Sequence, residues 1–394
     1  MNKYKRQWIF IILILLVMST ALTGCETYDN FKASFVEHEG ETQETVRIGV
    51  FEPLSGSDKE GGELEKMGIE LAHDLYPEVL GKKVELIYAD NKSDSLAAED
   101  VAKDLAKRKP AVVLGSYGNA LTLMGSDVFK AATIPAIAIT CSNPLVTSSS
   151  EYYFRACYVE SFQATATAKY AVDVLKAQKA AILKETENDY ATEVAKVFAS
   201  KFQSLTNQWS IVNETEYTTG SKDFKSQLQA IKNSKAQVLF LPGSVEDTAK
   251  IMKQAKEINL DIVFLGIDEW EDKKLVELGG KAVEGACFST YFDSNGDTNK
   301  TTDLFLKAFH EKYGGKKVPE AATVLAFDAY LMAIDAINQA GTAIDGEAVK
   351  DKLKKTKQFE GASGNITFDP TGDPVKSVFI KEIKDGKFIH AYTS

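Results

Sequence analysis

The sequence predicts an α/β protein made of two doubly wound lobes, each with a mainly parallel sheet that helices cover on both faces. Three observations lead to this prediction. From residue 46 onward, short apolar runs alternate with amphipathic stretches of helical period. The short runs are apolar on both faces, as expected for strands of a covered parallel sheet. The alternation restarts once after a short link, and 394 residues are enough for two domains.

The first lobe is expected to begin with four strands separated by three helices. The predicted strands are 46–51, 84–89, 111–115 and 134–139, and the predicted helices are 62–76, 95–108 and 119–131. In the second helix, Ala97, Val101 and Leu105 fall at i, i+4 and i+8 and mark its buried face. This order of elements is typical of a doubly wound sheet.

The second lobe is expected to repeat the same alternation. Its predicted strands are 179–183, 211–214, 237–241, 262–266 and 286–291, and its predicted helices are 164–175, 190–204, 224–232 and 245–258. Three more helices, 302–313, 321–340 and 346–355, precede terminal strands at 365–368, 378–383 and 388–390, with a turn at Asp385-Gly386. Long helices followed by strands suggest that the chain returns to the first lobe before it ends in the second.

The N-terminus has the pattern of a bacterial export signal that ends at a lipidation site. Three basic residues precede an apolar run at 8–18, and the sequence LTGC follows at 22–25. The apolar run is shorter than the about 20 residues of a membrane-spanning helix. We expect residues 1–24 to be a signal peptide, Cys25 to carry two acyl chains, and residues 25–45 to be a polar tether. The alternative is an uncleaved anchor with an incidental cysteine.

Composition and motifs exclude several functions. The formal net charge is −10 and there is no basic stripe, so a nucleic-acid partner is not expected. The cysteines and histidines do not have the spacing of a disulfide framework or of a zinc site. Phosphate-loop, dinucleotide-binding and nucleophile-elbow motifs are missing from the sequence, and Cys141 has no histidine near it to act as a base. We therefore expect a protein that is not an enzyme and has no cofactor and no metal.

The loops after the predicted strands are the candidate ligand site, because ligands of open parallel sheets bind beyond the carboxyl ends of the strands. These loops are 53–56, 115–119, 140–144, 187–190, 243–244 and 268–270. They carry hydroxyls, amides and carboxylates but no lysine or arginine. Helix N-terminal amides and one acid can bind a small zwitterion, whereas a phosphate would need a cation.

Segments along the whole chain resemble type I periplasmic-binding proteins, and among these the leucine/isoleucine/valine-binding family of ABC-importer receptors. They include IGVFEPLSG (48–56), VVLGSYGNALT (112–122), IPAIAITCSNPLVT (134–147) and AFDAY (326–330), and the resemblance covers residues 46–394. It implies two Rossmann-like lobes joined by a three-segment hinge, with an amino-acid ligand in the cleft between them. Lobe 1 would be 46–160 and 289–370, and lobe 2 would be 161–288 and 371–394.

The resemblance also implies a set of ligand contacts. Asn119 stands where the family has a serine that receives the ligand carboxylate, and Asp268 where it has the acid that pairs with the ammonium. Thr140 and Ser142 match the loop that holds both charges, and Tyr190 matches the tyrosine that closes over the ligand backbone. The structural alternatives are a helix cap for Asn119, a turn residue for Ser142, core packing for Tyr190 and a solvated loop for Asp268.

Three further residues, Tyr117, Glu160 and Trp270, are expected near the ligand without an assigned role, and Trp270 has core packing as its alternative. The loop Gly243-Ser244-Val245 departs from the family, because an aromatic residue usually stands about there. Its loss would enlarge the side-chain pocket or admit water.

The expected function is that of an extracytoplasmic, lipid-anchored receptor. It would capture an amino acid, branched-chain or similar, and deliver it to the transmembrane permease of an ABC importer. We expect a monomer attached to the membrane through Cys25. Two alternatives stay open: a receptor for an amide or urea type of ligand, and a ligand-sensing ectodomain that acts with a partner.

Overall fold

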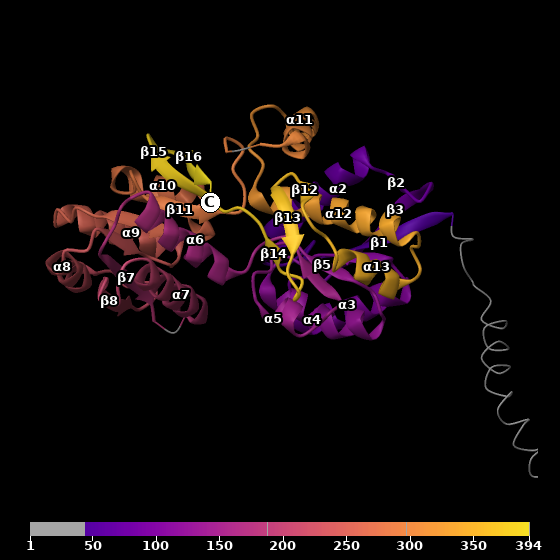
Figure 1. Ribbon diagram of the computed structural model, residues 1–394, viewed down its shortest axis with the longest axis horizontal. Coiled ribbons are helices and arrows are strands. Elements are labelled where there is room, and N and C mark those ends of the chain that lie inside the picture. The colour runs from indigo at the N-terminus through magenta and orange to yellow at the C-terminus, as the bar shows by residue number, and fades with distance from the viewer. Residues whose placement is uncertain (1–43, 187, 297, 394) are drawn as a thin grey trace, which may run out of the picture. The chain divides into compact units, whose positions relative to one another are not determined.

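The computed structural model describes residues 44–186, 188–296 and 298–393 (Figure 1). The predicted signal peptide, Cys25 and almost all of the predicted tether lie outside these residues. From Val46 onward the chain forms one compact unit. It contains two large sheets and one small one, and every predicted strand and helix is present within a few residues of its expected limits.

The first sheet has six strands in the order β2-β3-β1-β4-β5-β6. The strands are β1 (Thr45–Glu52), β2 (Glu78–Val79), β3 (Lys82–Asp90), β4 (Val112–Leu114), β5 (Ala136–Ala138) and β6 (Tyr153–Arg155). Strands β1, β4, β5 and β6 pair in parallel, and β2 pairs with β3 in an antiparallel hairpin. The sequence did not predict β2 and β6, which are only two and three residues long.

Helices cover both faces of this sheet (Figure 1). The covering helices are α2 (Lys59–Leu75), α3 (Ser95–Lys107), α4 (Asn119–Ala131), the short α5 (Leu145–Ser148) and the later α12 (Ala321–Ala340). Alternate residues of β4 pack on opposite faces: Val113 joins the core under α3 and α4, while Val112 and Leu114 join the core under α2 and α12. This two-sided burial explains why the strand is apolar throughout.

The second sheet has seven strands in the order β16-β15-β11-β10-β9-β7-β8. The parallel strands are β7 (Ala180–Glu185), β8 (Ile211–Tyr217), β9 (Val238–Phe240), β10 (Val263–Gly266) and β11 (Cys287–Thr290). The antiparallel strands are β15 (Phe379–Lys384) and β16 (Lys387–Thr393). Since β11 ends at Thr290, the second sheet includes two residues that the sequence assigned to the first lobe.

Helices also cover both faces of the second sheet (Figure 1). The helices α6 (Glu160–Asp173) and α7 (Asp189–Leu205) pack against each other on one face. The helices α8 (Lys225–Ser234), α9 (Val245–Glu257) and α10 (Lys273–Gly279) belong to the core of the other face. The two large sheets therefore have the predicted α/β architecture.

A later segment of the chain packs against helices of the first sheet. After α11 (Lys300–Tyr313), helix α12 packs along α2, where the Thr323 hydroxyl donates to the Leu64 carbonyl at 3.0 Å. A Cβ at Gly68 would lie 2.0 Å from the Thr323 carbonyl oxygen, so only glycine permits this close approach. The chain then forms α13 (Gly346–Leu353) and a small sheet of β12 (Phe359–Gly361), β13 (Gly364–Phe368) and β14 (Pro374–Val375) before β15 begins.

Helix α12 is, by length and composition, able to cross a membrane. It is the one such helix among the residues that the structure describes, and 72% of its apolar window is buried inside the protein. This burial is typical of the core helix of a soluble domain, and it agrees with the contact between α12 and α2.

Candidate ligand-binding site

The loops that follow β4 and β5 lie beside each other, because these two parallel strands pair through Val113 and Ala136. One loop carries Tyr117 and Asn119, and the other carries Thr140 and Ser142. Four of the eight predicted contact residues are thus brought together at the carboxyl end of the first sheet.

Helix α4 begins in the first of these loops. Its N-cap is Gly118, with a φ of +89° that favours glycine, so Asn119 is the first helical residue and does not cap the helix. Among the described residues no side chain caps this end, and the N–H groups of the first turn stay available to an anion. The Asn119 Oδ1 instead accepts a hydrogen bond of 3.4 Å from the backbone N–H of Asn143.

Ser142 and Glu160 are in direct contact. The Ser142 Oγ donates to Glu160 Oε1 at 2.8 Å, and Glu160 is the first residue of α6. Burial raises the pKa of Glu160, while hydrogen bonds from Ser142 and Asn119 and the charge of Arg155 act in the opposite direction. Asn119, Ser142 and Glu160 therefore form one connected group.

The buried side chain of Arg155 holds the loop after β5. Its guanidinium donates to the carbonyl oxygens of Cys141 at 3.0 Å and Asn143 at 2.8 Å, and to the Thr147 hydroxyl at 2.8 Å. Its Nε lies 2.6 Å from an oxygen of Asp373, which balances its charge. Arg155 is fully buried, and its guanidinium is occupied by these partners. It therefore holds the loop in place and is not available to bind a ligand.

Two buried acids that the sequence analysis missed lie beneath the same loops. Glu52, the last residue of β1, accepts from the Tyr117 backbone N–H at 2.9 Å, and Glu65 on α2 accepts from the Thr140 hydroxyl at 2.5 Å. Burial raises the pKa of Glu65 to about 7, and burial together with the charge of Glu65 raises the pKa of Glu52 well above its usual range. Burial therefore disfavours the charged form of both acids. An acid at the end of an apolar strand was the signal for it in the sequence.

In the second lobe, Asp268 follows β10 and is held by a glutamine. The Gln163 Nε2 donates to Asp268 Oδ1 at 2.7 Å, and the Asp268 N–H donates to Gln163 Oε1 at 3.3 Å. Burial, with a smaller contribution from the charges of Glu271 and Glu160, raises the pKa of Asp268 to about 6. Gln163 was not predicted, because a single glutamine on a helix has no distinguishing pattern.

Two tyrosines lie within electrostatic reach of Asp268, one from each lobe. Burial is the main cause of a raised pKa for Tyr117 and for Tyr190, and the charge of Asp268 adds to the shift of both. The Tyr117 ring lies against Gly61 on α2, where an added Cβ would come within 2.3 Å of it. Both predicted tyrosines are therefore near the predicted acid.

Trp270 does not join this group. Its side chain is fully buried in the core of the second lobe, and its ring lies over Gly266, where an added Cβ would be 2.2 Å away. The core alternative is the one that the structure favours, and we do not retain Trp270 as a ligand contact.

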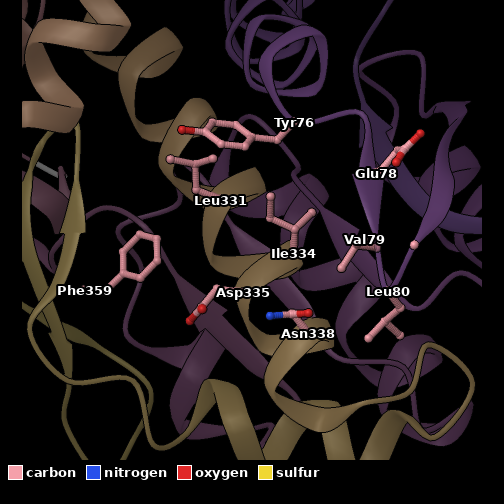
Figure 2. Close-up of a pocket in the computed structure, with 10 residues that line it drawn as sticks. Tyr76, Glu78, Val79, Leu80, Leu331, Ile334, Asp335, Asn338 and Phe359 are labelled. Atoms are coloured by element: carbon pink, nitrogen blue, oxygen red, sulfur yellow. The ribbon is translucent and has the colours of Figure 1, made fainter.

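A pocket of about 440 Å³ lies elsewhere, in the first lobe (Figure 2). Leu331, Ile334 and Asp335 of α12 line it, together with Tyr76 at the end of α2 and Phe359 of β12. The predicted contact residues are all outside it. Within the described part of the chain, no group of three or more histidine, cysteine or acidic residues could hold a metal ion.

The known proteins that are similar in sequence to this chain are binding proteins. A family model described as "Periplasmic binding protein" matches residues 45–387. The chain is 26% identical over 353 residues to the Leu/Ile/Val-binding protein homolog 2 of Brucella abortus, covering 87% of this chain and 92% of the relative. It is 27% identical over 355 residues to the Leu/Ile/Val-binding protein BraC3 of Rhizobium johnstonii, covering 88% and 94%.

Solved structures of the same kind superpose on this fold. The leucine binding protein LivK of Thermotoga maritima has a TM-score of 0.75 at 31% identity, covering 88% of this chain and 98% of that one. The branched-chain amino acid transporter substrate binding protein LivJ of Streptococcus pneumoniae, in complex with isoleucine, has a TM-score of 0.73 at 26% identity, covering 89% and 99%. A solute binding protein of R. palustris in complex with benzoate shares the fold, with a TM-score of 0.70 at 19% identity, 89% and 96% covered.

Proposed function

Since this chain belongs to the periplasmic binding protein family, type I, we propose that it captures an amino acid and delivers it to the permease of an ABC importer. It is an extracytoplasmic solute-binding protein of an ABC transporter, and its family consists of binding proteins and not of enzymes. The proposal adds the ligand class, the contact residues and the lipid anchor.

The observation that carries the proposal is the setting of Asp268. Gln163 fixes this carboxylate, its surroundings disfavour its charge, and the described residues place no lysine or arginine in ion-pair contact with it. A cationic partner stabilises the ionised form of a buried carboxylate, and the ammonium group of the ligand is such a partner. The open N-terminus of α4, with Asn119 beside it, supports binding of the ligand carboxylate in the first lobe.

The proposed mechanism is closure of the two lobes on the ligand. The carboxylate contacts belong to the first lobe and the ammonium contact to the second, so a ligand that bridges them binds the closed arrangement preferentially. Tyr190 and Tyr117, one from each lobe, would cover the ligand from opposite sides. No bond is made or broken in this mechanism.

Attachment through a diacylated Cys25 is the second part of the proposal. It rests on the LTGC sequence after the apolar run at 8–18. Two acyl chains are about what stable membrane anchoring requires. The anchor would keep the receptor close to its permease.

A thermal-shift screen tests the ligand class. At a ligand concentration about a hundred times Kd, binding to the native state adds about 2.7 kcal/mol of stability. We expect at least one L-amino acid to raise the melting temperature, with benzoate, urea and simple amides in the same screen as competitors. A shift with one of these and with no amino acid would contradict the proposed ligand class.

A further inference from the structure

The second lobe carries more acid near the proposed site than one ammonium group needs. Four carboxylates, which we call the acidic group, are Glu160 at the start of α6, Glu185 at the end of β7, and Asp268 and Glu269 after β10. Burial is the main cause that raises the pKa of Glu269 to about 7, and the charges of Asp268, Glu185 and Glu160 add to it. Glu269 is therefore close enough to the other three carboxylates for their charges to oppose its own.

The acidic group forms no ion pair with a lysine or arginine of the described residues, although the charge of the buried Arg155 reaches Glu160. Among the described residues, no ion pair reaches any of its four carboxylates, although acids around it are paired, such as Glu271 with Lys381 and Asp247 with Lys250. Glu185 is contacted by neutral donors only, the Asn188 amide at 2.6 Å and the Thr219 hydroxyl. Within the described residues, the negative charge of the acidic group is therefore not neutralised by an ion pair.

Glu269 is open to solvent and yet strongly perturbed. Its side chain is exposed, and desolvation by the protein atoms around it is still the main cause of its raised pKa. Protein atoms therefore surround this carboxylate while solvent still reaches it. Such a position is one that a small ligand can reach.

A second observation points to the same place. The Tyr217 side chain is only 2% exposed, and its hydroxyl has no hydrogen-bond partner among the described residues. The hydroxyl lies 2.2 Å from where a Cβ on Gly243 would stand, so it fills the space that a side chain at this position would need. The charges of Glu185, Asp247 and Glu269 reach it. A buried hydroxyl without a partner is unfavourable, and a polar ligand group would satisfy it.

The hydroxyls of the first lobe agree with this picture. Thr140 and Ser142 donate their protons to Glu65 and Glu160. Each hydroxyl is then left with lone pairs, which accept from a cationic nitrogen and cannot donate to a carboxylate.

We propose that the ligand carries a second cationic nitrogen, in addition to its α-ammonium, and that Glu185, Glu269 and Tyr217 form the subsite for it. The ligand class is then a basic amino acid, such as lysine or ornithine, and not an aliphatic one. This inference rests on the proposed function for the α-carboxylate and the α-ammonium, and it adds the side-chain specificity.

The test compares ligands that differ only in charged groups. The full chain, purified in detergent, is titrated by calorimetry with L-lysine, L-ornithine, L-norleucine and cadaverine. Norleucine is lysine without the side-chain amine, and cadaverine is lysine without the carboxylate. We expect L-lysine or L-ornithine to bind roughly tenfold tighter than norleucine or better, the size of one charge-assisted contact.

A variant assigns the effect to the subsite. Glu269→Gln removes one negative charge and keeps the shape, so it should weaken binding of the basic amino acid roughly tenfold and leave norleucine unchanged. The matched control is Glu277→Gln on α10, which removes the same charge from an exposed residue outside the site. Glu185→Gln is the second test variant, and circular dichroism confirms that each variant is folded.

Each result decides between the two proposals. If norleucine binds as tightly as lysine and ornithine, the basic side chain is wrong while the amino-acid receptor stands. If cadaverine binds and no amino acid does, the subsite stands and the proposed carboxylate contact is wrong. If none of the four probes binds, the subsite is wrong, and the thermal-shift screen of L-amino acids decides the proposed function separately. An equal effect of Glu269→Gln and Glu277→Gln would also overturn the subsite.

Discussion

The side chain of Gln163 is bonded to Asp268 at two points, through Nε2 to Oδ1 at 2.7 Å and through Oε1 to the Asp268 N–H at 3.3 Å. The same amide accepts from the Ser289 hydroxyl at 2.8 Å and donates to the Tyr291 hydroxyl at 2.9 Å. Gln163 is fully buried on α6, so it joins this helix to the ends of β10 and β11. It is a positioning residue for the acid on which the proposed ligand contact depends.

Gln163→Met should therefore affect both stability and binding. The Asp268 N–H and the Ser289 hydroxyl lose a buried partner, which costs about 1–3 kcal/mol of unfolding free energy. The Asp268 carboxylate also loses its fixed orientation, so ligand affinity should fall roughly tenfold. Urea unfolding and calorimetric titration measure the two effects.

The matched control for this variant is Gln254→Met on α9. The Gln254 amide also bridges two backbone groups, Lys222 O at 2.8 Å and the Phe224 N–H at 2.7 Å, but away from Asp268. Gln254→Met should lower the unfolding free energy and leave the ligand affinity unchanged. Equal affinities for the two variants would contradict a positioning role for Gln163.

Asp268→Asn should weaken ligand binding while it stabilises the ligand-free protein. Truncating one partner of a buried charge pair costs about 2–5 kcal/mol, which is roughly thirtyfold in Kd or more. In the ligand-free protein, however, the pKa of Asp268 is raised from 3.8 to about 6, so its charge opposes folding at neutral pH. Removing that charge should raise the unfolding free energy at pH 7.5 by roughly 1–3 kcal/mol.

The pH dependence checks the sign of this effect. The raised pKa of Asp268 lowers the unfolding free energy increasingly as pH rises from about 4 to about 6. The unfolding free energies of Asp268→Asn and the unmodified chain should therefore become equal near pH 4. Glu271 is unsuitable as a control, because it pairs with Lys381 and accepts from the Thr290 hydroxyl. The exposed Glu277→Gln serves instead, and a loss of stability in Asp268→Asn at pH 7.5 would contradict the assignment.

Ligand affinity itself should increase with pH. The ionised forms of Asp268 and Glu269 attract a cationic ligand, and their pKa values are about 6 and about 7. Between pH 5 and pH 8 we expect Kd to fall, by at most about tenfold per pH unit for each proton released. Calorimetric titrations across this range measure Kd at each pH. In Asp268→Asn, the change of Kd near pH 6 should be absent. A Kd that rises with pH would exclude both acids as partners of the ligand.

The buried pair of Glu52 and Glu65 should make stability depend on pH. The pKa of Glu65 is raised from 4.5 to about 7. Its contribution to the unfolding free energy is therefore fully present below pH 4.5 and is lost as pH rises to about 7. Glu65→Gln should therefore flatten the curve of unfolding free energy against pH in this interval. Chemical denaturation at several pH values tests it, with the exposed Glu311→Gln as control. A slope equal to that of the unmodified chain would show that Glu65 ionises normally.

Cys25→Ser tests the proposed anchor. The variant should be released from membranes or remain unprocessed, because serine cannot form the thioether to diacylglycerol. Partitioning into a detergent phase measures the effect, with Cys157→Ser as a control outside the signal. Identical partitioning of Cys25→Ser and the unmodified chain would exclude lipidation at this residue.

The sequence determined the order of the elements and the loops that border the site. Helices at 119–131 and 321–340 were predicted with the limits that the structure has, because mainly apolar runs of 13 and 20 residues are too long for strands. The parallel alternation also identified which loops meet at the carboxyl ends of the strands. Those loops carry Asn119, Ser142 and Asp268.

The tertiary structure decided which side chains meet. Gln163 and Asp268 are 105 positions apart, and only the packing of α6 against the strand ends brings them into contact. Trp270, two residues after Asp268, turns into the core instead, and Tyr217 from another strand fills the space beside Gly243. Periodicity reports how each segment folds by itself, whereas the partner of a buried side chain depends on strand order and register. These arise only when the hydrophobic faces of distant segments are buried together.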